Sequence, residues 1–227
     1  MRPAAAIYKL TMRVYREIME SAQPYTSRQQ QREHTRGQIL EAAIRVFAQS
    51  GFEAASLADI AQRAGVKKAL VQYHFATKDQ LWREAADRIW QERNGCMEIY
   101  FAETGEDPMG GLRAAFTALV AFTRERPQWL WFMFHEAASD SDRLDWLVEH
   151  WLKRDYLTGE SFVQHFQKLG LLRDGHPLQL LHMITGALTY NLLVAPQTLA
   201  ATGLDLGSDE SIRQQVDLLL AMIARPG

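Results

Sequence analysis

The stretch LADIAQRAGVKKALVQYHFATKDQLW, residues 57–82, decides the fold of this 227-residue chain. Ser56 and Asp59 have the spacing of a helix-capping box, so a short helix is predicted to begin there and to end at Gly65. A second short helix is predicted directly after the glycine, over Lys67 to Phe75. Two short helices joined by a glycine turn are typical of a helix-turn-helix, whose second helix enters the major groove of DNA.

Longer helices are predicted on both sides of this motif. The preceding helix is expected to begin at Thr35, with Gln38 as its capping-box partner, and to end at Gly51. The following helix is expected to begin at the capping box of Thr77 and Gln80 and to continue to about residue 104. The apolar stripe of the preceding helix consists of Ile39, Ala43, Val46 and Phe47.

The rest of the chain predicts an all-α fold. Apolar residues recur at intervals of three and four, without the period-two alternation of strands. Asp107 and Pro108 are suited to begin a helix, and Arg126 with Pro127 to separate two others. Further helices are expected over 141–170, 177–194 and 208–224.

The second helix of the motif carries side chains suited to DNA on its outward face. Leu70 or Val71 can anchor the helix together with Phe75, and the residues predicted to face outward are Lys67, Lys68, Gln72, Tyr73 and His74. Lysine neutralises phosphates and glutamine can pair with adenine, while tyrosine and histidine can donate to phosphates or pack against a thymine methyl. The alternative is a solvated polar face on an ordinary helix.

The sequence from Thr35 to Trp82, TRGQILEAAIRVFAQSGFEAASLADIAQRAGVKKALVQYHFATKDQLW, resembles the DNA-binding domain of the TetR/AcrR family of transcriptional regulators. The resemblance implies phosphate contacts by Ser56 and Lys78, while Leu70 and Gln72 depart from the family pattern and leave the operator sequence open. The DNA-binding residues predicted in this way are Ser56, Lys67, Lys68, Leu70, Gln72, Tyr73, His74 and Lys78.

The expected organisation is an N-terminal extension over 1–34, a three-helix helix-turn-helix domain over 35–82, and a C-terminal helical domain over 83–227 for ligand binding and dimerisation. The extension is read as weakly ordered, as preceding the true start of the protein, or as an arm that contacts DNA or the second subunit.

Segments 134–151 and 180–210 are similar to the effector domain of the family. The resemblance implies a homodimer joined by a four-helix bundle. The apolar faces assigned to that bundle are Leu180, Leu181, Ile184 and Leu188, then Val216, Leu219, Leu220 and Ile223, with Gly186 and Ala187 allowing close approach.

A small-molecule site is predicted where aromatic residues concentrate, between Phe116 and Phe166. Aromatic residues at helical spacing also pack ordinary cores, so either role is open for each of them. The predicted ligand-binding residues are Phe116, Trp131, Phe134, His135, Glu136, His150 and Phe162. No histidine spacing indicates a metal ligand set, so no metal and no cofactor are expected, and the single cysteine, Cys96, is expected to be buried and inert.

Charge and composition limit the remaining classes. Residues 28–83 carry nine Lys or Arg and five Asp or Glu, whereas residues 84–227 carry twelve and twenty, so only the N-terminal part is suited to a polyanion. No enzyme motif, secretory signal or membrane span is predicted, and a cytoplasmic protein is expected. The predicted function is a ligand-responsive repressor that binds a palindromic duplex operator as a homodimer. The alternative is an architectural DNA-binding protein without a ligand.

Overall fold

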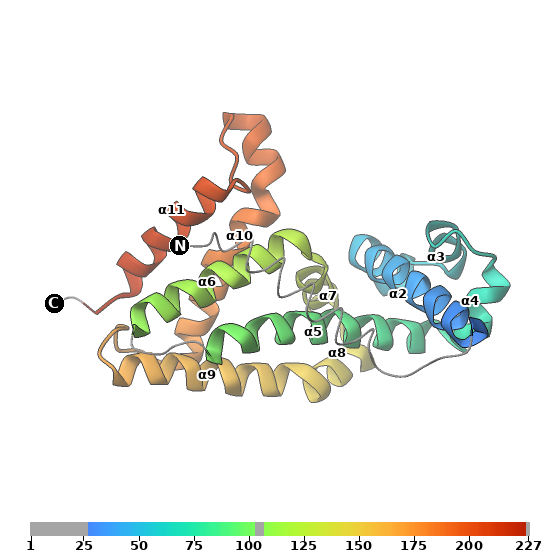
Figure 1. The fold of residues 1–227 in the computed structure, drawn as a ribbon, viewed down its shortest axis with the longest axis horizontal. Helices are drawn as coiled ribbons and strands as arrows, with labels where there is room; N and C mark the ends of the chain where they lie inside the picture. Colours follow the sequence, from blue (N-terminus) through green and yellow to red (C-terminus); the bar gives the residue numbers. More distant parts are fainter. Residues whose placement is uncertain (1–26, 103–106, 226–227) are drawn as a thin grey trace. The chain divides into compact units, whose positions relative to one another are not determined.

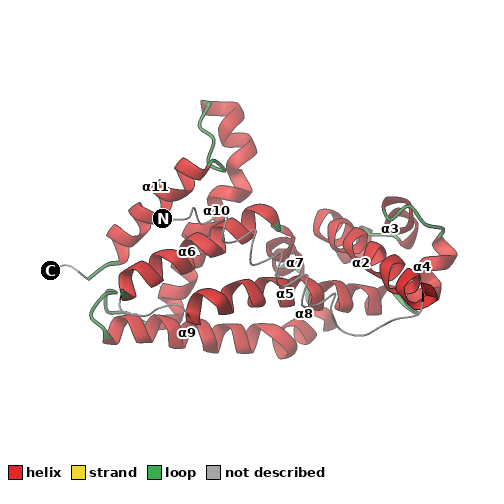
Figure 2. Ribbon diagram, viewed as in Figure 1, coloured by secondary structure: helices red, strands yellow, loops and turns green. Residues whose placement is uncertain are grey.

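The computed structural model describes residues 27–102 and 107–225, and their regular structure is helical (Figures 1 and 2). Within these residues the only β pairing is one antiparallel bridge between Leu172 and Ala224, which agrees with the predicted all-α class. The helices, in chain order, are α2 (Ser27–Ala54), α3 (Leu57–Arg63), α4 (Lys68–His74), α5 (Lys78–Ala102), α6 (Pro108–Glu125), α7 (Gln128–Ala137), α8 (Asp142–Leu147), the π-helical turn η1 (Val148–Leu152), α9 (Lys153–Lys168), α10 (Pro177–Thr202) and α11 (Asp209–Ile223).

The packing divides the chain into two compact units. The helix-turn-helix unit comprises the described residues of 14–93 together with 128–148, and the C-terminal unit comprises those of 94–127 and 149–227. Helices α7 and α8 therefore pack with the helix-turn-helix, although about fifty residues separate α7 from α4. The boundary predicted at residue 82 separates a DNA-binding domain from a domain for ligand binding and dimerisation. This functional division stays a prediction.

The core of the helix-turn-helix unit centres on Phe132 of α7. Its ring stacks on Trp82 of α5 with centroids 5.6 Å apart, and the rings of Phe47 and Trp90 meet it edge-on at 6.3 and 6.5 Å. Phe132 is 2% exposed. Aromatic pairs in these geometries add to the stabilisation from apolar burial, so α7 is held firmly against α2 and α5.

The predicted start of the first helix at Thr35 is wrong. Helix α2 begins at Ser27, and the Thr35 hydroxyl donates to the carbonyl oxygen of Gln31 at 2.9 Å, one turn earlier. A threonine inside a helix can satisfy its hydroxyl in this way, so the residue does not have to act as a cap. Residues 27–34, which were included in the predicted N-terminal extension, are therefore helical, while residues 1–26 lie outside the described part of the chain.

The predicted caps around the motif are confirmed. The Ser56 hydroxyl accepts from the backbone N–H of Asp59 at 3.1 Å, and the Thr77 hydroxyl accepts from that of Gln80 at 3.0 Å. Gly51 interrupts α2 with φ 70° and ψ 175°, a conformation open essentially to glycine alone. The capping pattern therefore located α3 and α5 correctly.

The C-terminal unit has its own core between α6, α9, α10 and α11. The buried members of this core are Leu112, Phe116, Val120, Val163, Phe166, Leu172, Ile184, Leu188, Ile212, Val216, Leu219, Leu220 and Ile223. Asp107 caps α6 at the backbone N–H of Gly110, as predicted from the Asp-Pro pair. Helix α10 runs through Pro196 to Thr202, eight residues beyond its predicted end.

The apolar faces assigned to the dimer bundle are mostly intramolecular. Ile184, Leu188 and Val216 are at most 4% exposed because α6 and α9 of the same chain cover them. Most of these residues are therefore buried within one chain. A different row of apolar residues remains exposed, formed by Met183 and Tyr190 on α10 and by Leu218 and Met222 on α11.

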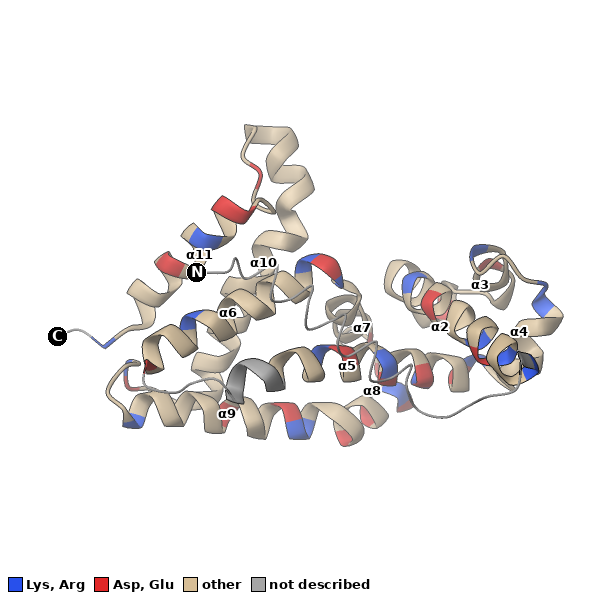
Figure 3. Cartoon of the chain, viewed as in Figure 1, with Lys and Arg blue, Asp and Glu red and all other residues tan. Residues whose placement is uncertain are grey.

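Helix α10 is unusual in composition. It contains no charged residue, as Figure 3 shows, and by length and hydropathy it alone among the described helices is suited to cross a membrane. Only 17% of its most apolar window is buried. Core helices of water-soluble proteins can meet the same criteria, so this property alone does not assign α10 to a membrane.

Candidate nucleic-acid interface

The turn between α3 and α4 positions the second helix of the motif. Gly65 has φ 69°, its N–H donates to the carbonyl of Gln62 at 3.1 Å, and the N–H of Val66 donates to that of Ala61 at 3.0 Å. This paired pattern ends a helix with a left-handed residue, for which glycine is favoured. The chain can then begin α4 after Lys67.

Helix α4 buries one face and exposes the other. Val71 is fully buried and Phe75, which follows the helix, is 1% exposed, so these two residues anchor it as predicted. Leu70 is not part of the anchor, because 37% of it is exposed. The predicted outward residues Lys67, Lys68, Gln72 and Tyr73 are exposed, and His74 is half-buried.

Two arginines of α2 lie beside α4. The guanidinium of Arg32 lies over the ring of Tyr73, 5.8 Å from its centroid, and that of Arg36 lies 5.0 Å from the centroid of Phe75. Arg36 also pairs with Glu84 of α5. Neither arginine was among the predicted DNA-binding residues: Arg32 lay before the helix predicted to begin at Thr35, and Arg36 lay inside it. The four-residue spacing of the two arginines, which places them on one face of a helix, was the sequence signal that could have indicated them.

The surroundings of His74 favour its neutral form. Burial lowers its pKa from 6.5, the charges of Arg32 and Arg36 lower it further, and Glu33 acts in the opposite direction. Its Nδ1 atom is buried and has no hydrogen-bond partner within the described part of the protein. His74 thus titrates at the edge of the exposed face of α4.

Ser56 and Lys78 occupy the starts of two helices. Ser56 caps α3, and Lys78 is the first residue of α5. The ammonium group of Lys78 donates to the carbonyl oxygen of Glu53 at 3.3 Å and lies 4.4 Å from the ring centroid of Phe52. Helix starts attract phosphate because their backbone N–H groups are unpaired and their dipole is positive.

The predicted ligand-binding residues fall into both units. Those on α7, in the helix-turn-helix unit, are Trp131, Phe134, His135 and Glu136, whereas Phe116, His150 and Phe162 lie in the C-terminal unit. Phe116 is 4% exposed in the C-terminal core, and Phe162 packs against that core. His150 is exposed on η1. Their role in binding a ligand stays a prediction.

The four residues on α7 have distinct surroundings. Trp131 and Phe134 are 41% and 46% exposed and meet edge-on with centroids 6.2 Å apart. His135 contacts the carbonyl oxygen of Ala48 through Nε2 at 3.0 Å, so it supports the turn at Gly51. Glu136 is buried and bonded within the protein.

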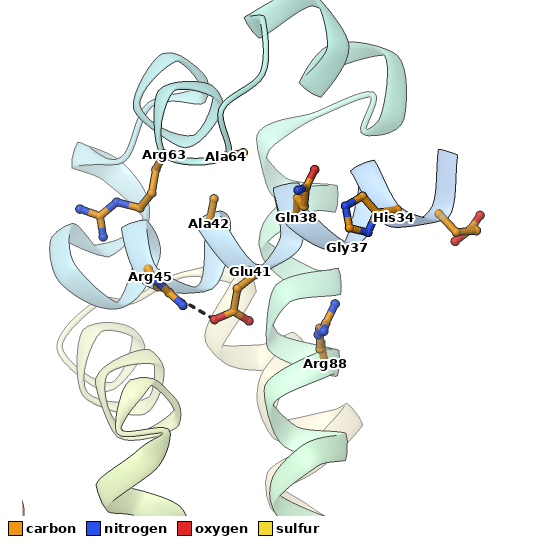
Figure 4. Close-up of a pocket in the computed structure, with 10 residues that line it drawn as sticks. His34, Gly37, Gln38, Glu41, Ala42, Arg45, Arg63, Ala64 and Arg88 are labelled. Atoms are coloured by element: carbon orange, nitrogen blue, oxygen red, sulfur yellow. Dashed lines mark hydrogen bonds and ion pairs between the residues drawn. The ribbon is translucent and has the colours of Figure 1, made fainter. Parts of the chain in front are cut away.

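A groove of about 460 Å³ opens on the helix-turn-helix unit beside α2, α3 and α5 (Figure 4). Figure 4 shows charged side chains along its wall, including the ion pair of Arg45 and Glu41. In this pair Nε of Arg45 lies 3.2 Å from Oε1 of Glu41. Its charged lining residues are Glu33, Glu41, Arg45, Arg63 and Arg88. This charged wall differs from the aromatic lining predicted for an effector.

Metal and thiol chemistry receive no support in the described residues. They contain no group of three or more His, Cys, Asp or Glu side chains that could hold a metal ion. Cys96 is 2% exposed, and burial raises the pKa of its thiol to about 12. A thiol held neutral in this way is a poor nucleophile, so Cys96 is buried as predicted.

Two short helices joined by a glycine turn, the second with an exposed polar face, have the geometry of a helix-turn-helix motif. Residues 39–85 match the model of the family described as bacterial regulatory proteins, tetR family. The chain is 34% identical over 98 residues to the HTH-type transcriptional regulator TtgR of Pseudomonas putida, covering 41% of this chain and 47% of that protein. It is 28% identical over 192 residues to the HTH-type transcriptional regulator RutR of Escherichia coli K12, covering 79% and 84%.

Solved structures share the fold over most of the chain. The ketosteroid transcriptional regulator KstR2 of Mycobacterium tuberculosis superposes with a TM-score of 0.67 at 19% identity, covering 84% of this chain and 95% of that one. The hemolysin II regulator HlyIIR gives a TM-score of 0.66 at 21% identity, covering 86% and 99%.

Residues 39–85 therefore form a TetR-type DNA-binding domain, and the fold of most of the chain is that of the solved regulators. These relatives are transcriptional regulators, which agrees with the prediction that the chain is not an enzyme. The match to TtgR spans about half the length of that protein.

Proposed function

We propose that this protein is a cytoplasmic repressor that binds a near-palindromic DNA operator as a homodimer and is released by a small apolar or aromatic effector. The observation that carries the proposal is the exposed face of α4, with Lys67, Lys68, Gln72 and Tyr73 directly after the Gly65 turn. In a helix-turn-helix this face meets base edges and phosphates.

The neighbouring cations support the DNA-binding part of the proposal. Arg32 lies over Tyr73 and is exposed at the N-terminal end of α2, next to the face of α4. Lys78 and the start of α3 at Ser56 supply further groups suited to phosphate. Phosphate contacts set affinity and orientation, whereas contacts from Gln72 and Tyr73 to base edges would set sequence preference.

The exposed apolar row on α10 and α11 supports the homodimer. Met183 and Tyr190 are 66% and 62% exposed, and Leu218 and Met222 are 65% and 61% exposed. The residues recur at helical spacing on two consecutive helices, and α10 carries no charge. Large apolar patches of this kind mark interaction surfaces. We assign the four-helix interface to this row in place of the buried faces first assigned to it.

The effector part of the proposal rests on aromatic residues of α6, α7 and α9. Trp131 and Phe134 of α7 offer exposed rings, and Phe116 and Phe162 belong to the region of the C-terminal core. An effector releases DNA only if it binds more tightly to a form of the dimer that binds DNA poorly. Thermal-shift screening with apolar and aromatic compounds, followed by operator-release titration of each hit, tests this part.

Selection from a random duplex library with the purified full chain tests the DNA-binding part. We expect enrichment of a motif with two inverted half-sites about one helical turn, roughly 34 Å, apart or a small multiple of that spacing. Binding that remains equal for all sequences after repeated rounds would contradict the proposal and favour an architectural DNA-binding protein.

A further inference from the structure

Two cations from distant parts of the sequence meet at Phe52 and Glu53, in the last turn of α2. The ammonium group of Lys78, at the start of α5, lies 4.4 Å from the ring centroid of Phe52, and the guanidinium of Arg143 of α8 lies 3.8 Å from it. Both cations also bond the next residue. Lys78 donates to the carbonyl oxygen of Glu53, and Arg143 donates to its carboxylate, each at 3.3 Å. Phe52 and Glu53 therefore connect α5 to α8.

Arg143 is held in place from the side of α7. Its Nε donates to the carboxylate of Glu136 at 3.3 Å, and Ser141 donates to the same carboxylate at 2.7 Å. Glu136 is 2% exposed and the side chain of Arg143 is 13% exposed. A cation over an aromatic ring is attracted more strongly when it is shielded from water. The ring of Phe52 is thus fixed by Arg143, and it also stacks on Phe47 with centroids 6.0 Å apart.

We propose that Arg143 and Phe52 are positioning residues that hold Lys78 ready to contact the DNA backbone. The proposal rests on the proposed function, in which Lys78 contacts a phosphate. Lysine has a flexible stem of four carbons, and fixing it on binding lowers affinity through lost rotamer freedom. Its ammonium group has three donors, so a bond to Glu53 leaves two for a phosphate oxygen. The corner of α7 and α8 thereby contributes to DNA affinity without touching DNA.

The experiment measures binding of the full chain to a random-sequence 30-base-pair duplex over a series of salt concentrations. A random duplex is suitable because phosphate contacts are independent of sequence. Lys78→Ala should weaken binding and reduce the slope of log K against log salt by about 0.9, the value for one phosphate contact. Phe52→Leu and Arg143→Gln should each weaken binding about two- to tenfold, the range for immobilising one long side chain.

Double variants separate positioning from a merely structural role. In the Lys78→Ala background, Phe52→Leu and Arg143→Gln should cause no further loss, because the side chain that they position is absent. Arg45→Gln is the matched control, since it removes a positive charge from the same unit, and the pair that Arg45 makes with Glu41 lies at the surface. It should leave the effects of the other variants unchanged.

Several outcomes would overturn the proposal. It fails if folded Phe52→Leu binds like the wild type, or if it weakens binding equally with and without Lys78. Far-UV circular dichroism identifies variants that fail to fold. If Arg143→Gln unfolds because Glu136 loses its partner, Phe52→Leu decides the question alone. Absence of salt-dependent binding by the wild type would instead overturn the proposed function itself.

Discussion

At the scale of single residues, Glu136 is the least exposed charged side chain described in the helix-turn-helix unit. It is 2% exposed, and its partners are Arg143 and the hydroxyls of Ser139 and Ser141. A buried carboxylate needs a full set of partners because water cannot replace them. The buried carboxylate of Glu136 therefore holds the connection between α7 and α8 in place.

Arg143→Ala should destabilise the protein strongly. Removing one partner of a buried ion pair leaves an uncompensated charge and costs about 3 to 5 kcal/mol. Arg45→Ala, which breaks an exposed pair with Glu41, should cost only about 0 to 1 kcal/mol. Urea unfolding at one protein concentration gives both values. Equal losses for the two variants would show that the environment of Glu136 does not matter.

Two glycines of α2 should respond oppositely to substitution by alanine. Gly51 has φ 70° and a Cβ there would lie 3.3 Å from His135, so Gly51→Ala should cost about 1 to 3 kcal/mol. Gly37 is helical and a Cβ there would make an ordinary contact with Arg88 at 3.7 Å, so Gly37→Ala should stabilise by about 0.5 to 1 kcal/mol. Thermal unfolding measures both changes. A neutral Gly51→Ala would contradict the strained turn.

At the scale of elements, α4 is anchored by the buried side chains of Val71 and Phe75 and carries a titratable residue, His74, at the edge of its exposed face. Burial and the charges of Arg32 and Arg36 lower the pKa of His74, while Glu33 opposes them. The charged form is thus disfavoured in the folded protein. Its contribution to stability is present above pH 6.5 and decreases as the pH falls below that value.

DNA binding should become tighter as the pH falls from 8 to 6, and His74 should be one cause. A nearby phosphate favours the protonated imidazole, so the pKa of His74 should be higher in the complex than in the free protein. Protonation then accompanies binding. Anisotropy titrations at constant ionic strength measure the effect, and His74→Gln should reduce it. An identical pH dependence in the variant would exclude His74 from the contact.

The elements around the motif were predictable from local chemistry. Ser56, Gly65 and Thr77 located the ends of α3 and the start of α5, because caps and left-handed residues act within a few positions of the chain. Thr35 gave the wrong helix start, since its hydroxyl bonds a carbonyl one turn back and no local signal distinguishes this from capping. The packing of Phe132 against Trp82 depends on tertiary contacts that periodicity does not encode.

The same limit explains the site residues. The outward face of α4 followed from helical geometry alone. By contrast, Ile184 and Met183 are adjacent apolar residues on α10, and the sequence did not indicate that the first is 4% and the second 66% exposed. Which apolar face is covered within the chain depends on how α6 and α9 pack.

At the scale of the whole molecule, the exposed row on α10 and α11 should hold the dimer together. Leu218→Glu places a charge in that row and should give a monomer with weaker operator binding. Leu157→Glu is the matched control, because Leu157 of α9 is 66% exposed outside the row. Sedimentation velocity measures the mass of each variant. A dimer that survives Leu218→Glu, or is lost with Leu157→Glu, would place the interface elsewhere.

The central claim is that the exposed face of α4 reads DNA sequence. The most direct test is to repeat the selection from random duplexes with Gln72→Ala and Lys78→Ala beside the wild type. We predict that Gln72→Ala changes the preferred base at one symmetric pair of positions, whereas Lys78→Ala enriches the wild-type motif with weaker binding. If Gln72→Ala and Tyr73→Ala both enrich the wild-type motif with unchanged base preferences, α4 is not the reading element and the claim is contradicted.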